Sequence, residues 1–287
     1  MQNGEIVWLA SYPKSGNTWV RLLLGNLLGL KDDDENPGDN FNPVTGISSD
    51  RFVFEYCVGL NSYELTRSEI DRVRADVYRM MVRDKPGLKY IKAHDAFGWR
   101  PDGKALFPGD CSRGAVYMVR DPMDVAVSYA HHQGHDAFDQ TVAGMNDTTK
   151  FIGGGRKEQL HQFTGGWSRH YQSWAEQTEM PVCVVRYEDL RADTTRQLSR
   201  IAKFIGLEEA DFAVSIEEAV EASRFDRLQK IEEEKGFAER PANSKRFFRS
   251  GRSGEGRETL PDELQNQIIS NHADVMRELG YLERETQ

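Results

Sequence analysis

The run Glu5-Ile6-Val7-Trp8-Leu9-Ala10, followed closely by Tyr12-Pro13-Lys14-Ser15-Gly16-Asn17-Thr18-Trp19, decides the fold. Its first part is short, apolar and rich in residues that favour strands, which predicts a buried strand. The second part is a turn, after which apolar residues recur at helical spacing as far as Gly29. A strand, a turn and a helix in this order are typical of the first unit of a parallel α/β sheet.

The rest of the chain repeats this alternation. The apolar runs at 88–93, 115–119 and 182–185 predict three more strands, and helical periodicity marks 68–82 and 194–205. Asp121-Pro122 supplies an N-cap and a first-turn proline for another helix. We therefore expect a three-layer α/β fold, with a central parallel sheet flanked by helices, as a single domain over residues 1–287. The polar stretches 31–60 and 134–166, the second with Gly153-Gly154-Gly155, predict loops, and we expect the second to be mobile.

Composition narrows the possible functions. Acidic residues number 46 and basic residues 37, which leaves a net charge of −9. This balance argues against a nucleic acid or an anionic membrane as the partner. Three widely spaced cysteines indicate neither a disulfide framework nor a zinc motif. No signal peptide and no membrane span are predicted, so a cytoplasmic protein is expected.

The turn at 12–19 has the features of an anion site. Backbone N–H groups and the positive end of a helix dipole meet there, which suits a phosphate. Lys14 adds a point charge, and Ser15, Asn17 and Thr18 add neutral donors. The lysine precedes the only glycine, so the segment is not a Walker A motif. Taken alone, it is equally compatible with an ordinary turn that carries a surface lysine.

A second segment strengthens the anion hypothesis. In Val116-Tyr117-Met118-Val119-Arg120-Asp121-Pro122-Met123-Asp124-Val125-Ala126-Val127-Ser128, Arg120 leaves the end of a strand and Ser128 lies about two helical turns later. Both side chains are placed to reach one anion near the carboxyl end of the sheet, where open α/β sheets bind ligands. The alternative for Arg120 is an ion pair with Asp121 or Asp124.

Together these segments resemble those of the PAPS-dependent sulfotransferases, especially the cytosolic type. Residues 14–19 resemble the family's 5′-phosphosulfate loop, and residues 120–128 resemble its 3′-phosphate-binding segment. Arg249-Ser250-Gly251-Arg252-Ser253-Gly254-Glu255 is similar to the family's C-terminal Arg-Lys-Gly-x-x-Gly-Asp segment. Lys92-Ala93-His94 gives a weaker match. The resemblance runs from residue 7 to about 257 and implies the P-loop-kinase-like sulfotransferase fold.

Some positions depart from the family pattern. Asn17 stands where the family often has Thr, Ser250 replaces a Lys, and Gly256 replaces a Trp. The missing lysine removes one positive charge expected near the 3′-phosphate. The family's C-terminal dimer motif is also absent, which leaves the oligomeric state open.

The resemblance implies transfer of a sulfuryl group from PAPS to a hydroxyl, or less often an amine, of a small molecule, with release of PAP and without a metal. It makes His94 the general base, Lys14 the charge on the departing oxygen, and Lys92 a contact to the sulfuryl group. The polar stretches 31–60 and 134–166 would line the acceptor site. The residues implied to bind PAPS are Lys14, Ser15, Gly16, Asn17, Thr18, Trp19, Arg120, Ser128, Tyr187, Ser223, Phe225, Arg249, Ser250 and Gly251.

Other interpretations remain. Tyr187 and Phe225 also fit packed core aromatics, and His94 and Lys92 also fit ordinary strand-end residues. For His131, His132 and His135, a solvent-facing or acceptor-pocket role is favoured, and a metal site is the weaker alternative. For the whole protein, the alternatives are a nucleoside or small-molecule kinase and a PAP- or PAPS-binding module without turnover.

Overall fold

The computed structural model describes residues 2–30, 46–100, 102–155, 159–241 and 244–283. The chain forms two compact units. The first consists of Met1–Tyr12, Thr45–Met118 and Thr148–Val184, and the second of Pro13–Val44, Val119–Asp147 and Val185–Gln287.

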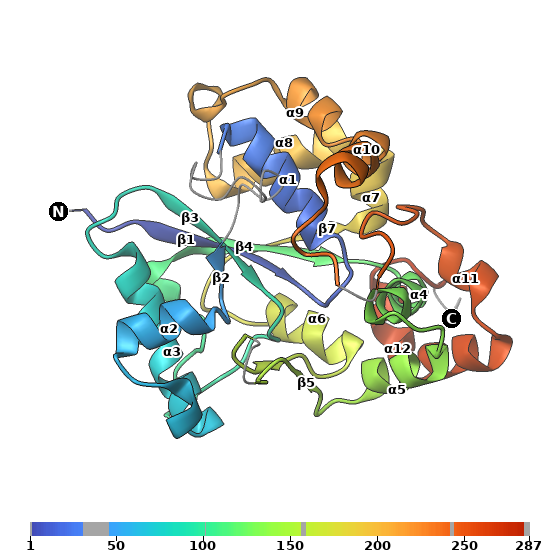
Figure 1. The fold of residues 1–287 in the computed structure, drawn as a ribbon, viewed down its shortest axis with the longest axis horizontal. Coiled ribbons are helices and arrows are strands. Elements are labelled where there is room, and N and C mark those ends of the chain that lie inside the picture. Colours follow the sequence, from blue (N-terminus) through green and yellow to red (C-terminus); the bar gives the residue numbers. More distant parts are fainter. Residues whose placement is uncertain (1, 31–45, 101, 156–158, 242–243, 284–287) are drawn as a thin grey trace. The chain divides into compact units, whose positions relative to one another are not determined.

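The first unit is built on a five-stranded sheet. β1 pairs in parallel with β3 and with β4, and β2 pairs in parallel with β3 (Figure 1). Residues Ile6 to Ala10 are fully buried, so β1 is covered on both faces, as in a doubly wound sheet. The predicted fold class is confirmed: a central parallel sheet flanked by helices. The strand order is β2-β3-β1-β4-β7, with β1 Glu5–Ser11, β2 Gly46–Ile47, β3 Leu88–Ala93, β4 Ser112–Val119 and β7 Val182–Arg186.

Aromatic side chains fill the core beneath one face of this sheet. The Trp8 ring meets Tyr78 of α3 (Arg67–Val82) and Phe107 edge-on, with ring centroids 4.9 and 4.8 Å apart. Phe107 in turn contacts Trp174 of α6 (Trp167–Ala175) at 4.9 Å. These contacts place α3 and α6 on the sheet face that carries Trp8. The unit also contains α2 (Arg51–Val58), η1 (Ser62–Glu64) and η2 (Gly109–Cys111).

The two predicted loop stretches are only partly irregular. Residues 31–45 lie outside the described residues, but 46–60 contain β2 and α2, whose N-cap Asp50 accepts from the backbone N–H of Val53. Between 134 and 166 lie α5 (Phe138–Asn146) and the antiparallel pair β5 (Phe151–Ile152) and β6 (Gln162–Phe163). The prediction of a loop across 134–166 was therefore wrong. Long-range bonds, such as Ala96 N–H to Phe163 O at 2.7 Å, stabilise this glycine-rich stretch.

The second unit is helical. α1 contacts α9 and α9 contacts α8, while α4 contacts α5, α11 and α12 (Figure 1). Asp121 caps α4 by accepting from Met123 N–H, and α8 ends at Gly206 with φ of 80°, both as predicted. Its other elements are α1 Asn17–Leu28, α4 Pro122–Gln133, α7 Tyr187–Ala192, α8 Thr194–Ile205, η3 Glu209–Asp211, α9 Ile216–Ala222, α10 Phe225–Lys235, α11 Glu255–Thr259 and α12 Asp262–Glu278.

The strand register sets where the functional segments begin. Ala10 of β1 lies opposite Ala93 of β3, and Ser11 lies opposite Met118 of β4. The chain therefore leaves β1, β3 and β4 at the same edge of the sheet, the carboxyl edge where α/β folds bind ligands. Among the described helices, none combines the length and apolar character needed to cross a membrane.

Candidate active site

The loop between β1 and α1 has an unusual backbone. Lys14 has a φ of 68° and Gly16 a φ of 99°, both in the left-handed region. A residue with a side chain costs about 1–2 kcal/mol in that region. Strain of this kind is retained where a site needs a particular backbone shape.

The first turn of α1 favours an anion. No side chain caps this helix, and its first turn contains no acidic residue. Its N–H groups and the positive end of its dipole therefore attract negative charge. A carboxylate in fact contacts this turn: Thr18 Oγ1 donates to Glu239 Oε2 at 3.0 Å, and buried Arg21 donates to Glu239 Oε1 at 2.5 Å.

Lys14 is held over an aromatic ring. Its Nζ lies 4.4 Å from the centroid of Phe247 and 3.3 Å from Nδ1 of His132, to which it can donate. His132 belongs to α4, one turn beyond Ser128, so both lie on one face of that helix. Phe247 was not among the predicted site residues, because an aromatic residue carries no positional signal by itself.

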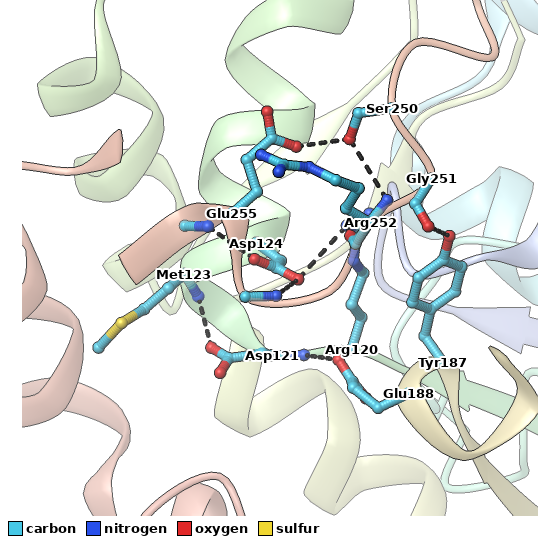
Figure 2. A network of polar contacts seen from close by, with 12 residues as sticks. Arg120, Asp121, Met123, Asp124, Tyr187, Glu188, Ser250, Gly251, Arg252 and Glu255 are labelled. Carbon is cyan, nitrogen blue, oxygen red and sulfur yellow. Dashed lines mark hydrogen bonds and ion pairs between the residues drawn. The ribbon is translucent and has the colours of Figure 1, made fainter. Parts of the chain in front are cut away.

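Arg120 is buried and held from three sides (Figure 2). Its Nη2 donates to Arg252 O at 2.8 Å and to Asp124 Oδ2 at 3.4 Å. Its guanidinium lies 4.4 Å from the centroid of the Tyr187 ring. These contacts fix the plane of the guanidinium, as bidentate recognition of a phosphate requires.

Tyr187 joins the segments that were predicted to bind an anion. A Cβ on Gly16 would lie 2.8 Å from Tyr187 Cδ2, so the ring packs directly on the loop. On its other sides the ring meets Arg120, and its hydroxyl donates to Gly251 O at 3.1 Å (Figure 2). Burial raises the pKa of Tyr187, which keeps the hydroxyl protonated as a donor. The structure thus brings the segments of Lys14, Arg120 and Gly251 together around one ring.

Asp124 attaches the C-terminal segment to α4. Its carboxylate accepts from Gly254 N–H at 3.0 Å and from Gly256 N–H at 2.7 Å. A Cβ on Gly256 would lie 2.2 Å from the backbone carbon of Met123. This close approach leaves no room for a side chain at position 256. From the sequence, Asp124 was predicted only as a possible ion-pair partner of Arg120.

The C-terminal segment presents less free charge than its arginines suggest. Arg249 Nη1 pairs with Glu255 Oε1 at 2.7 Å. Ser250 Oγ donates to Glu255 Oε2 at 2.6 Å (Figure 2). Burial acts to raise the pKa of Glu255, but the hydrogen bonds and charge of Arg249 and Ser250 outweigh it and lower that pKa. Ser250 therefore contributes a neutral contact to this segment.

The residues expected at the base of the nucleotide form a packed group. Trp19 Nε1 donates to Ser223 O at 2.9 Å, and the Ser223 hydroxyl, fully buried, accepts from Asn26 at 2.9 Å. A Cβ on Gly251 would lie 2.6 Å from the Phe225 ring. Phe225 and Trp19 thus border the segments above, whereas the contacts of Ser223 are internal to the helices.

Two buried polar atoms suit an incoming anion. Ser15 Oγ and Arg120 Nε are among several buried side-chain atoms of the described residues that lack a hydrogen-bond partner. Such groups cost about 1–3 kcal/mol each when left unsatisfied. They lie in the loop and the arginine segment that meet at Tyr187, so the residues fit a ligand with two anionic ends.

Lys92 and His94 belong to the first unit. Lys92 lies in β3, opposite Leu9 of β1, and His94 follows the strand. His94 Nδ1 donates to Ser11 O at 2.9 Å and lies 3.3 Å from Ser11 Oγ. Because a carbonyl only accepts, this bond assigns the Nδ1 proton and leaves the lone pair of the neutral ring on Nε2.

The histidines at the end of α4 have separate surroundings. His131 Nδ1 lies 3.4 Å from Asp136, and burial with nearby Arg249 lowers its pKa. Over the described ranges, no cluster of three or more histidine, cysteine or carboxylate side chains is placed to hold a metal ion.

Comparison with known proteins gives the family. The sulfotransferase domain family matches residues 5–280. The luciferin sulfotransferase of Photinus pyralis is 26% identical over 215 residues, which cover 71% of this chain and 52% of that protein. The flavonol 3-sulfotransferase of Flaveria bidentis is 25% identical over 280 residues, covering 91% and 78%. The chain thus spans about half of the first relative and about three quarters of the second.

The fold is similar to that of a solved sulfotransferase structure. The crystal structure of mouse sulfotransferase SULT7A1 complexed with PAP superposes with a TM-score of 0.57 at 16% identity, covering 98% of this chain and 88% of that one. The chain belongs to the sulfotransferase domain family, and the predicted family is confirmed.

Proposed function

We propose that this protein is an enzyme that transfers a sulfuryl group from PAPS to a hydroxyl of a small molecule and releases PAP. The observation that supports this most is the convergence of the Lys14 loop and Arg120 on the Tyr187 ring. A donor with anionic groups at both ends of one adenosine matches two cationic segments joined in this way. A kinase remains the weaker alternative, because the loop lacks the glycine-lysine pair of a Walker A motif.

Arg120 would hold the 3′-phosphate, helped by Ser128, Arg249 and the backbone of Gly251. Its Nε is buried and unpartnered, and its stacking on Tyr187 orients the guanidinium. Arg249 is already paired with Glu255, and Ser250 is neutral. Arg120 therefore carries most of the charge recognition at this end.

Lys14 and the first turn of α1 would hold the 5′ end. When bound, PAPS supplies a sulfuryl group activated by its link to the 5′-phosphate. Lys14 places positive charge where negative charge develops on the departing oxygen, which is the main way enzymes assist such transfers. Ser15, Gly16, Asn17 and Thr18 would contribute donors from the helix start, and Trp19, Tyr187 and Phe225 would line the adenosine, with buried Ser223 supporting Trp19 from behind. Lys92 would contact the sulfuryl group.

His94 would be the general base. Its Nδ1 bond to Ser11 O leaves Nε2 as the basic atom, suited to take the proton of the acceptor hydroxyl. The names of the luciferin and flavonol enzymes support a small-molecule acceptor. A cytoplasmic location, inferred from the sequence, is part of the same proposal.

Replacement of the base tests the proposal. In His94→Ala, we expect turnover of labelled PAPS with a panel of phenols and alcohols to fall by about 10²–10⁴-fold, the contribution typical of a general base. PAP affinity, measured by calorimetry, should stay within error, because His94 is not assigned to PAP binding. Equal loss of PAP affinity and turnover would show that His94 has only a structural role.

A further inference from the structure

A second histidine lies directly behind His94. His170 of α6 is fully buried, and both of its ring nitrogens are engaged. Nε2 lies 3.1 Å from the carbonyl oxygen of His94, and Nδ1 lies 2.8 Å from the hydroxyl of Tyr117, itself 1% exposed. The function proposed above makes no use of either residue.

The partners of His170 assign its protons. The His94 carbonyl only accepts, so Nε2 carries a proton and donates it. Nδ1 then holds the lone pair and accepts from the Tyr117 hydroxyl. Burial lowers the pKa of His170 to about 4, so the ring is neutral at physiological pH and keeps this tautomer.

These contacts close a ring that also contains the start of the Lys14 loop. The backbone of Tyr12 hydrogen-bonds to the Tyr117 hydroxyl, and the Tyr12 ring meets His170 edge-on at 5.6 Å. Ser11, the residue before Tyr12, accepts from His94 Nδ1 at 2.9 Å. We name the ring of Ser11, Tyr12, Tyr117, His170 and His94 the histidine circuit. All of its members lie in the first unit.

The residue after His94 is held as well. Trp174 Nε1 donates to Asp95 O at 2.9 Å, and the buried Asp95 carboxylate pairs with Arg74 at 2.8 Å. The main chain is thus fixed at two successive carbonyls, so the His94 ring has little freedom except rotation about its own side-chain bonds. The Ser11 bond at Nδ1 restrains that rotation.

We propose that His170 is a positioning residue for His94: through the histidine circuit it fixes the His94 main chain and thereby keeps Nδ1 on Ser11 and Nε2 aimed as the base. This inference rests on the proposed role of His94. It goes beyond that role because it assigns a function to a buried group that touches neither donor nor acceptor.

Two amide substitutions test it, because each can replace one of the two ring nitrogens. His170→Gln keeps an amide N–H that can reach the His94 carbonyl, whereas the shorter His170→Asn can face only Tyr117. We expect His170→Asn to lower kcat by about 10–100-fold, as misplacement of a catalytic group by about 1 Å does. His170→Gln should recover most of that loss. PAP affinity should be unchanged in both.

A second readout separates positioning from stability. In ¹⁵N-labelled protein, imidazole spectra should show His94 as the Nδ1–H tautomer in the wild type and in His170→Gln, and as a mixture of tautomers in His170→Asn. Tyr117→Phe, which keeps the ring and removes the hydroxyl, should shift His94 in the same direction. This spectrum needs no substrate, so it decides the positioning claim even if the wild type failed to bind PAP.

His272 of α12 provides the matched control. It is 4% exposed, and burial lowers its pKa to about 4, but it belongs to the second unit. His272→Asn should cost stability and leave the His94 spectrum and kcat unchanged. The proposal is overturned if folded His170→Asn keeps the wild-type tautomer of His94, or if His170→Asn and His272→Asn lower kcat equally.

Discussion

Gly16 has room for a hydrogen atom and for nothing larger. Its φ of 99° lies where side chains are strained, and a Cβ would lie 2.8 Å from the Tyr187 ring. The same ring supports Arg120 and donates to Gly251 O. One glycine therefore determines how closely the loop approaches the residues assigned to the other end of the donor.

Gly16→Ala should weaken PAP binding by roughly tenfold, about 1.4 kcal/mol, because the displaced Tyr187 ring would carry Arg120 with it. It should also lower the free energy of unfolding by about 1–2 kcal/mol through backbone strain. Calorimetric titration with PAP and urea unfolding measure the two effects separately.

Gly280→Ala is the control for strain alone. Gly280 has a φ of 74°, yet nothing lies within 4 Å of its Cβ position. It should lose similar stability and keep full PAP affinity. Wild-type PAP affinity in folded Gly16→Ala would show that the loop and Tyr187 are not coupled.

At the scale of the element, α4 connects the segments proposed to bind the donor. Asp124, Ser128 and His132 follow one another at intervals of four residues and share a face of the helix. Asp124 holds the C-terminal segment, and His132 contacts Lys14. The face spans two turns, or about 12 Å of rise, and so links the segments assigned to the two ends of the donor.

Asp121 at the N-terminus of α4 should make the free energy of unfolding depend on pH. Burial raises the pKa of Asp121 from 3.8 to about 6, aided by Asp124 and Glu188, although Met123 N–H and Arg257 act in the opposite direction. The folded state therefore binds a proton more tightly than the unfolded state between about pH 4 and 6. As pH rises through this window, the wild type should lose up to about 1.4 kcal/mol of stability per pH unit from this group.

Asp121→Asn should remove this loss and keep the N-cap, because asparagine caps as well as aspartate. Urea unfolding of both proteins at pH 4, 5, 6 and 7 gives the comparison. The variant should gain on the wild type as pH rises to about 6, with a constant difference above. Parallel curves across the window would show that Asp121 ionises normally.

The elements that sequence predicts well are those with local determinants. Asp121-Pro122 starts α4 and Gly206 ends α8, because capping involves residues within a few positions. The position of β6 could not be predicted, because it depends on a distant bond from Ala96 to Phe163. Composition alone reports only that the stretch 134–166 is rich in glycine and polar residues.

In the candidate site, too, residues in local motifs can be located from the sequence, whereas contacts between distant residues cannot. Lys14 and Arg120 stand in short motifs at strand ends and were predictable. The hydrogen bonds of Asp124 to Gly254 and Gly256, about 130 residues away, could not be predicted. The position of the Phe247 ring beside Lys14 could not be predicted either. Neither contact leaves a periodic or compositional trace.

At the scale of the whole molecule, the net charge of the protein does not favour the anionic ligand that the proposed function requires. The net charge of −9 repels anions at long range, yet the proposed donor carries several negative charges. The local arrangement resolves this: Arg120 and Ser15 present buried unpartnered polar atoms, and the start of α1 adds its dipole. Buried groups interact strongly at short range and are little screened, so they outweigh a diffuse surface charge.

The most direct test compares PAP with AMP, which differs from it only by the 3′-phosphate, and with ATP and magnesium, in calorimetric titrations of the full chain. Hydrogen bonds to charged groups contribute about 1.5–3 kcal/mol, so PAP should bind at least about tenfold more tightly than AMP. Arg120→Lys should remove most of this difference, whereas Arg196→Lys on the exposed side of α8 should not. Equal affinity for PAP and AMP, or tighter binding of ATP with magnesium, would contradict the account.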